Sequence, residues 1–157
     1  MKAYRLTVKD GNPLAEINNF FKKLLAKNVV DSLLVPQDTA ARTSVVQSLV
    51  KAEEEIEGVN PFAPLLLMNS ATLLGQLTCD KPKERIGALL RSCEIRAAVE
   101  LIKLKQINTD NLVIIGVDCL GTYESTVYQE FIKKFKDNAV LTKQFLSGDK
   151  EGGQDAL

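Results

Sequence analysis

Apolar and polar residues are arranged along the chain in blocks whose spacing predicts helices and strands. Between residues 14 and 28 the apolar positions recur every three or four residues, which is the spacing of one face of an amphipathic helix. Largely apolar segments of strand length occur at residues 29–36, 85–91 and 111–118. The last two runs carry apolar residues on both faces, which is typical of central strands in a parallel sheet.

The remaining segments complete an alternation of strands and helices. We expect further strands at residues 2–8 and 41–50, an exposed loop or frayed turn at 51–61, helices at 62–77, 93–106 and 124–138, and turns at 9–13 and 79–84. The expected buried stripes of the last two helices are Ile95, Ala98, Val99 and Ile102, and Val127, Phe131 and Phe135. The strand at 29–36 is expected to end at Pro36, because proline cannot donate to a sheet ladder. This order predicts an α/β fold, a layered βαβ sandwich around a mostly parallel central sheet.

Length and composition favour one globular domain, which we expect at residues 1–146. The polar, glycine-rich tail at 147–157 is expected to be a linker to a C-terminal region, although a natural end there is equally compatible with the sequence. Twenty basic residues balance twenty acidic ones, so no net charge favours nucleic acid. The longest apolar region is interrupted by Pro64, Asn69 and Gly75, and no signal peptide is evident. Three cysteines without evident partners fit a reducing compartment. We therefore expect a cytoplasmic protein without a membrane span.

Several kinds of chemistry are excluded by residues that the sequence lacks. The chain contains no histidine, which removes Ser–His and Cys–His nucleophiles and histidine metal ligands. It also lacks the GxGxxG and GxxxxGK[ST] phosphate-binding motifs and any Cys-x-x-Cys pair. Three separated cysteines cannot alone complete the four-thiolate shell of a common iron–sulfur cluster.

Polar and thiol side chains follow the first of the two expected central strands. Arg91, Ser92, Cys93 and Glu94 come where this strand ends and the next helix begins, and Arg96 follows. Ligands of parallel α/β sheets bind beyond the carboxyl ends of the strands. Ser92 is a candidate N-cap, the helix N-terminus suits an anion and favours a thiolate, and arginine pairs well with phosphate.

A second polar segment follows the next expected strand. Asp118 and Cys119 come first, Gly121 permits a tight turn, Thr122 offers a hydroxyl, and Tyr123 can stack or hydrogen-bond. If the two strands are neighbours, both segments border one crevice suited to a phosphate-bearing or planar ligand.

A purely structural interpretation competes with this one. Cysteine is often buried as a small apolar residue, so Cys79, Cys93 and Cys119 would then belong to the core. Ser92 and Glu94 would only cap a helix and complement its dipole. The residues alone do not decide between the two interpretations.

The segments "LLRSCEIRAAVELIKLKQ" (89–106) and "NLVIIGVDCLGTY" (111–123) together resemble the beta-subunit family of coenzyme F-420-reducing hydrogenases and formate dehydrogenases. In members of this family a similar arginine is followed by a small residue or proline, by the sequence CEIRA and by a helix with the pattern VEL-KLKQ. A strand that ends in a glycine, an aspartate and a cysteine comes next. The resemblance is densest over residues 85–123. Ser92 stands where many relatives have proline, and members are commonly longer, with further cysteine-rich segments.

The resemblance implies a flavoprotein subunit that binds FAD and iron–sulfur clusters. Such subunits relay electrons between a metal-containing partner and a carrier such as coenzyme F-420, NAD(P) or ferredoxin. The cofactor-binding residues that it implies are Arg91, Ser92, Cys93, Glu94, Arg96, Asp118, Cys119, Gly121, Thr122 and Tyr123. Cys93 and Cys119 would bind metal only with ligands from elsewhere, and no residue is assigned to catalysis.

Two alternatives accompany this hypothesis. The chain would otherwise be a non-catalytic assembly module of a redox complex, with structural cysteines, or would hold part of an iron–sulfur site that another chain completes. In each case the partners are the other subunits of a redox complex.

Overall fold

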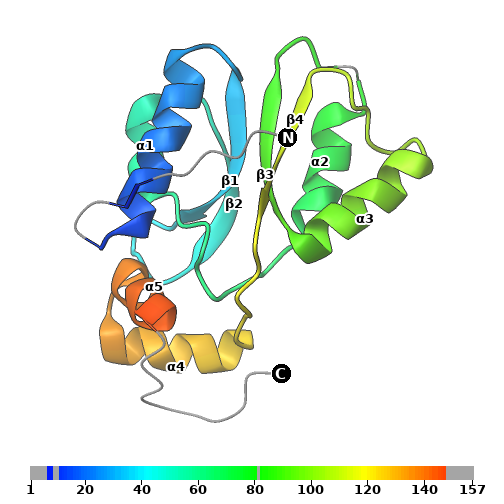
Figure 1. Cartoon of the computed structure of the whole chain (residues 1–157). Coiled ribbons are helices and arrows are strands. Elements are labelled where there is room, and N and C mark those ends of the chain that lie inside the picture. The colour runs from blue at the N-terminus through cyan, green and yellow to red at the C-terminus, as the bar shows by residue number, and fades with distance from the viewer. Residues whose placement is uncertain (1–6, 9–10, 81, 148–157) are drawn as a thin grey trace.

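A mixed four-stranded sheet forms the centre of the protein in the computed structural model, which describes residues 7–8, 11–80 and 82–147 (Figure 1). Its strands are β1 (Ser32–Asp38), β2 (Val45–Val50), β3 (Ile86–Arg91) and β4 (Leu112–Val117), in the order β2-β1-β3-β4. β1, β3 and β4 run parallel, and β2 is antiparallel to β1. The sheet confirms the predicted α/β fold with a mostly parallel sheet.

Helices cover the two faces of the sheet and lie beyond one of its ends (Figure 1). The described helices are α1 (Pro13–Ala26), the 3-10 helix η1 (Glu53–Gly58), α2 (Ser70–Thr78), α3 (Ser92–Lys103), α4 (Ser125–Phe135) and α5 (Asn138–Ser147). α1 and η1 cover one face, and α2 and α3 cover the other. α4 and α5 lie beyond the carboxyl ends of the parallel strands.

Alternation of side chains along β1 and β3 produces the two apolar layers. Leu33 and Leu89 pack with Phe21 of α1, whereas Leu34 and Leu90 pack with the α2 and α3 side chains. All six residues of β3 are buried, as predicted for a central strand.

β4 was predicted to be central and is instead the edge strand of the described sheet. Val113 and Ile114 are 37% and 40% exposed. The prediction was wrong because an apolar run indicates only that side chains on both faces of a strand can pack against other elements. It does not show that another strand pairs with its backbone on each side.

β1 continues through Pro36 to Asp38, although the sequence predicted that it would end at this proline. Pairing with β3 stops at Leu34, so no β3 carbonyl requires an N–H from Pro36. The Pro36 carbonyl accepts a hydrogen bond of 2.9 Å from the Asn60 N–H. One-sided pairing therefore allows proline inside this strand.

Two helices differ from the prediction at their ends. Only the second half of the helix expected at 62–77 forms, because the Asn69 side chain accepts a hydrogen bond from the Ala71 N–H and starts α2 at Ser70. A packed helix, α5, was not predicted after residue 138. Lys136 ends α4 in the left-handed conformation, and Asp137 then caps α5 by accepting from the Ala139 N–H.

Most positions of the expected stripes of α3 and α4 pack against the core. These are Ile95, Ala98 and Ile102 of α3 and Phe131 and Phe135 of α4, whereas Val99 and Val127 are exposed. The prediction missed the buried residues Glu94 of α3 and Tyr128 and Ile132 of α4. Most of the strand expected at 2–8 lies outside the described residues. Within the described ranges, no helix combines the length and apolar character that crossing a bilayer requires.

Candidate functional site

The two polar segments predicted to share a crevice follow neighbouring strands. β3 and β4 pair in parallel register from Ile86 opposite Leu112 to Arg91 opposite Val117. Neighbouring strands lie about 4.8 Å apart, so the residues after Arg91 and Val117 leave the sheet side by side. The adjacency on which the predicted site depended is therefore present, and we name it the β3–β4 edge, made of residues 92, 93, 96 and 118–122.

Arg91 and Glu94 point into the protein rather than toward this edge. Glu94 is 1% exposed, and its Oε1 accepts hydrogen bonds from Ser70 N at 2.8 Å and Ser70 Oγ at 2.6 Å. Its Oε2 accepts from Arg91 N at 2.9 Å. The Arg91 guanidinium donates to the Ala63 carbonyl at 2.6 Å. Both side chains thus join the β3–α3 junction to residues 63–70, and a ligand role for them stays a prediction.

The N-cap of α3 lies one residue before the predicted one. Arg91 has extended backbone angles and Ser92 is the first helical residue. The Arg91 N–H donates to the Glu94 carboxylate, three residues further along, so this buried side chain caps the N-terminus of α3. The Ser92 hydroxyl is therefore not the cap and lies exposed.

The outward side of the β3–β4 edge carries thiols and charges. Cys93 and Cys119 are both exposed and free, and Arg96, Asp118 and Thr122 are exposed as well. Cys79, at the end of α2, is also exposed. The alternative in which the three cysteines are buried core residues is wrong, because all three side chains are exposed.

Gly121 and Tyr123 lead the chain from the edge into α4. Gly121 has φ +108°, a conformation that favours glycine. The Tyr123 N–H donates to the Pro64 carbonyl at 2.9 Å. Its ring packs against Phe131 and Phe145, with centroids 4.9 and 5.8 Å away. Tyr123 therefore fixes the position of the α4–α5 pair beneath the sheet.

The described residues do not gather a metal-binding set. No group of three or more Cys, Asp, Glu or His side chains with suitable geometry occurs among them. Cys93, Asp118 and Cys119 therefore do not fit an iron–sulfur cluster by themselves.

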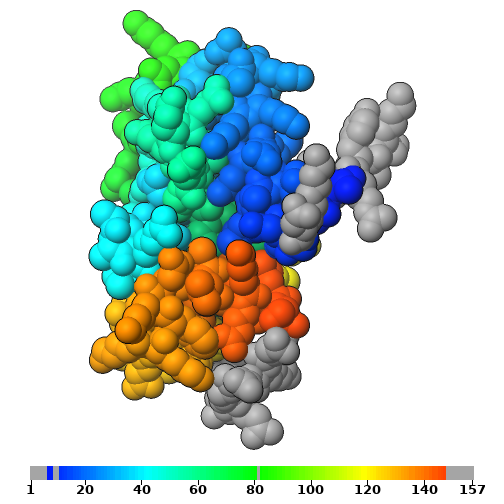
Figure 2. Space-filling view, turned by 90° about the vertical axis from the view of Figure 1, so that its left-hand side faces the viewer, coloured from blue at the N-terminus to red at the C-terminus, as the bar shows by residue number. Residues whose placement is uncertain are grey.

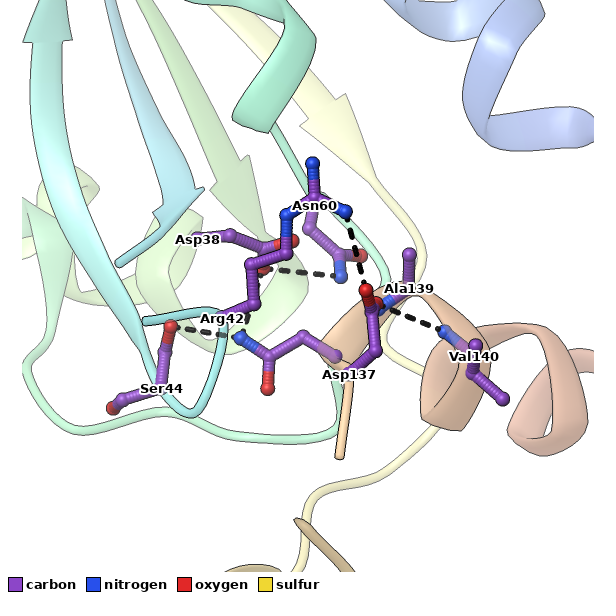
Figure 3. Close-up of polar contacts among 8 residues, drawn as sticks. Asp38, Arg42, Ser44, Asn60, Asp137, Ala139 and Val140 are labelled. Carbon is purple, nitrogen blue, oxygen red and sulfur yellow. Dashed lines mark hydrogen bonds and ion pairs between the residues drawn. The ribbon is translucent and has the colours of Figure 1, made fainter. Parts of the chain in front are cut away.

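A buried polar cluster at the end of β1 was not predicted from the sequence (Figure 3). Asp38 Oδ1 accepts hydrogen bonds from Asn138 Nδ2 at 3.1 Å and Asn60 Nδ2 at 3.4 Å. Asn138 also donates to the Ser44 carbonyl and accepts from the Tyr128 hydroxyl at 2.6 Å. These residues are far apart in sequence, so no local spacing pointed to them. The cluster attaches α4 and α5 to β1 and β2.

Burial sets the protonation behaviour of this cluster. Partial burial of the Asp38 carboxyl group raises its pKa above the ordinary value of 3.8. The hydrogen bonds from Asn138 and Asn60 act in the opposite direction but do not cancel this effect. Burial also raises the pKa of Tyr128, and nearby Asp38 adds to this shift. Burial alone would raise the pKa of Asp137, but hydrogen bonds from Ala139 N and Arg42 outweigh it and lower the pKa.

Together, the fold and the edge define an α/β protein with two accessible thiols at the carboxyl end of a parallel strand pair. No family model matches the chain. It is 30% identical over 123 residues to the F420-dependent formate dehydrogenase 1 subunit beta of Methanococcus maripaludis, an alignment that covers 76% of this chain and 30% of that subunit. It is 27% identical over 119 residues to the F420-dependent formate dehydrogenase subunit beta of Methanocaldococcus jannaschii, covering 76% of this chain and 31% of that subunit.

The chain is thus a distant member of the family of these beta subunits, as its sequence predicted. It spans about a third of the length of the relatives that it matches.

Proposed function

We propose that this chain is an electron-transfer component of a coenzyme F-420-linked oxidoreductase, and that its β3–β4 edge forms one wall of a flavin site. The observation that carries the proposal is the parallel pairing of β3 with β4, because the segments that follow these strands, which carry the exposed residues Cys93 and Cys119, start at the same end of the sheet. Two relatives named as F420-dependent formate dehydrogenase beta subunits support the class of reaction.

The charges at the edge suit a phosphate-bearing cofactor. The first turn of α3 presents backbone N–H groups, and exposed Arg96 lies in the second turn of the same helix. Asp118 and Thr122 provide hydrogen-bonding groups on the neighbouring segment. Bound FAD would supply the hydride and single-electron chemistry. The residues of the edge would orient the cofactor and balance its charge.

The edge is open rather than enclosed. Asp118, Cys119 and Leu120 are all exposed, and the two hollows described for this structure are lined by other residues. A buried flavin therefore requires a second wall. We propose that another subunit, or a further part of the complete protein, supplies it, and we derive no step through an iron–sulfur cluster.

The test is anaerobic titration of the chain with FAD, alone and together with its co-purified partner subunits, followed by flavin absorbance and fluorescence. Arg96→Ala and Asp118→Ala should each weaken binding by about tenfold. Lys103→Ala, at the far end of α3, and Asp80→Ala serve as matched controls and should leave binding unchanged. Saturable binding only with partners would support the two-wall site, whereas absence of flavin binding in both samples would overturn the proposal.

One observation favours an assembly role as a second candidate. β4 leaves one side of its backbone unpaired among the described strands, and Val113 and Ile114 beside it are partly exposed. Such an edge suits addition of a strand from a partner subunit. Ile114→Lys should then abolish co-purification of the partner, and Leu104→Lys, at another exposed apolar position, should not.

A further inference from the structure

β2 forms the edge of the described sheet that lies opposite β4, and it pairs with β1 alone. Its sequence, VVQSLV, contains neither a charged residue nor a proline, although these residues are the usual protection of an exposed edge against pairing. Val46 and Leu49 are 43% and 38% exposed. Figure 2 shows the cyan surface of the turn between β1 and β2 at the left margin of the molecule. The edge of β2 is therefore unprotected and lies on the outside of the protein.

The backbone of β2 alternates between residues that are bonded to β1 and residues that point away from it. Gln47 lies opposite Pro36 in the register. The Pro36 carbonyl accepts a hydrogen bond of 2.9 Å from the N–H of Asn60, and Asn60 follows Val59, which bridges β1 on the side away from β2. Gln47 and Pro36 are thus a pair without hydrogen bonds between them, so the N–H and C=O of Gln47 point away from β1.

The turn before β2 gives the same alternation. The Thr39 N–H donates to the Ser44 carbonyl at 2.9 Å, so Ser44 points toward β1. The outward residues are therefore Val45, Gln47 and Leu49. Each of them directs one N–H and one C=O to a side of β2 where the described chain places no strand.

An apolar hollow lies beside the same edge. Its volume is about 310 Å³, and it is lined by residues 45–47 of β2, residues 65–68 and Leu73. Leu67 and Met68 in its wall are 56% and 53% exposed. A strand added to the edge would place a side chain directly opposite Val45, on the same face of the sheet. An apolar side chain at that position would cover part of the hollow.

We propose that the edge of β2 pairs with β2 of a second copy of the chain, antiparallel and around a twofold axis at Gln47. In this register Gln47 lies opposite Gln47 of the other copy, and Val45 lies opposite Leu49. The outward residues then meet as hydrogen-bonded pairs, each of which exchanges bonds in both directions. Leu49 of each copy covers the hollow beside Val45 of the other. The two four-stranded sheets become one continuous sheet.

The charges that flank β2 favour a second copy in this orientation. Arg42 lies in the turn before β2 and bonds to Asp137 at 3.2 Å, yet 68% of its side chain is exposed. Glu53 and Glu54 follow β2 and are exposed. Antiparallel pairing puts the start of one strand beside the end of the other, so Arg42 of each copy approaches the two glutamates of the other copy. A twofold axis supplies this complementarity twice without requiring a different partner sequence.

This inference does not rest on the flavin proposal, because no residue of β2 belongs to the β3–β4 edge. β4, at the opposite edge of the sheet, stays available to another subunit.

Sedimentation equilibrium of the full chain tests for the second copy. The unmodified chain should show twice its own mass at the upper end of a roughly hundredfold range of concentration. Gln47→Pro removes an outward N–H that β1 does not use, so two bonds across the axis are lost and the dimer should weaken at least about tenfold. Gln47→Ala keeps this N–H and is the matched control, which should dimerise as the unmodified chain does. Circular dichroism should show that both variants are folded.

A monomer at every concentration would overturn the proposal, including a monomer that binds a strand of a different subunit at β2. A dimer that Gln47→Pro leaves intact would also overturn it, because another surface would then hold the copies together.

A disulfide tests the register without the proline variant, in a chain whose Cys79, Cys93 and Cys119 are replaced by serine. Gln47→Cys places two thiols at a symmetric hydrogen-bonded pair, whose Cα atoms lie about 5.5 Å apart and within disulfide range. Ser48→Cys is the matched control, since it is half-buried like Gln47 but displaced along the strands from its counterpart, beyond the roughly 7 Å that a disulfide spans. Air oxidation should cross-link Gln47→Cys at least about tenfold faster than Ser48→Cys. Equal rates, or no cross-linked dimer, would overturn the pairing.

Discussion

Removal of the Glu94 carboxylate is expected to destabilise the fold more than any surface substitution on α3. Glu94 is buried and accepts three hydrogen bonds, from Ser70 N, Ser70 Oγ and Arg91 N. In Glu94→Ala both backbone N–H groups lose their acceptor inside the protein.

The size of the effect follows from the two stranded donors. Each unsatisfied buried donor costs about 1–3 kcal/mol, and the space left by the side chain adds to this. We expect Glu94→Ala to lower the free energy of unfolding by about 3–5 kcal/mol, a large share of the roughly 5–15 kcal/mol of an ordinary domain. Glu94→Gln retains one oxygen but turns an NH2 group toward a donor, so it should lose about half as much.

Urea denaturation followed by far-ultraviolet circular dichroism measures this difference, and the thermal midpoint should fall by roughly 10 °C. Glu100→Ala is the matched control, because Glu100 is exposed on the same helix and is bonded to Lys103 at 2.9 Å. The control should stay within about 0.5 kcal/mol of the parent. A Glu94→Ala midpoint equal to that of the control would refute the structural role derived for this carboxylate.

The other predictions concern the three thiols, the partly buried carboxyl group of Asp38 and the glycine at position 87. All three cysteines should react with a thiol reagent in the folded protein, and protection of any of them in the isolated chain would contradict the exposed positions. Because the pKa of Asp38 is raised above 3.8 in the folded state, folding favours the protonated carboxyl group. The stability that this group contributes is therefore present at low pH and is lost as the pH rises through the folded-state pKa. Asp38→Asn should therefore gain in stability relative to the parent as the pH rises from about 4 to 7 in a series of urea titrations, and a constant difference would refute this. In Gly87→Ala the new Cβ would lie 2.7 Å from Leu33 Cδ2, so we expect a loss of about 1–3 kcal/mol. Gly116→Ala, whose nearest contact is 3.3 Å, should lose less in the same denaturation assay.

Local signals in the sequence predicted the framework of the fold. The spacing of apolar residues predicted α1 and α3, and the largely apolar segment at 85–91 predicted the buried strand β3. The errors occur where tertiary context decides. Pro36 is accommodated because its neighbour β3 has already separated from β1, and β4 is at an edge because no further described strand pairs with it. Both features depend on strand pairing, which the local sequence does not determine.

The candidate site divides in the same way. Strand ends that pair in parallel were predictable from the strand–helix–strand order, and the structure brings them together. The direction of each side chain was not predictable. Asp38 accepts hydrogen bonds from Asn60 and from Asn138, and Asn138 lies 100 residues further along the chain, at the start of α5. Contacts at such separations have no spacing rule, so the buried cluster emerged only from the structure.

Alternation of direction within the segment from Arg91 to Arg96 explains how one motif can serve both stability and chemistry. Arg91 and Glu94 are buried and hold residues 63–70 against the start of α3. Cys93 and Arg96, between and after them, face outward. Because the inward pair fixes the backbone at the strand end, the outward pair is presented in a set position without contributing to the core. Substitutions of Arg91 or Glu94 should therefore lower the unfolding midpoint, and any loss of flavin binding should follow from that loss of stability. Substitutions at the outward positions should change binding at an unchanged midpoint, and a shared loss of both properties at Cys93 or Arg96 would contradict this division.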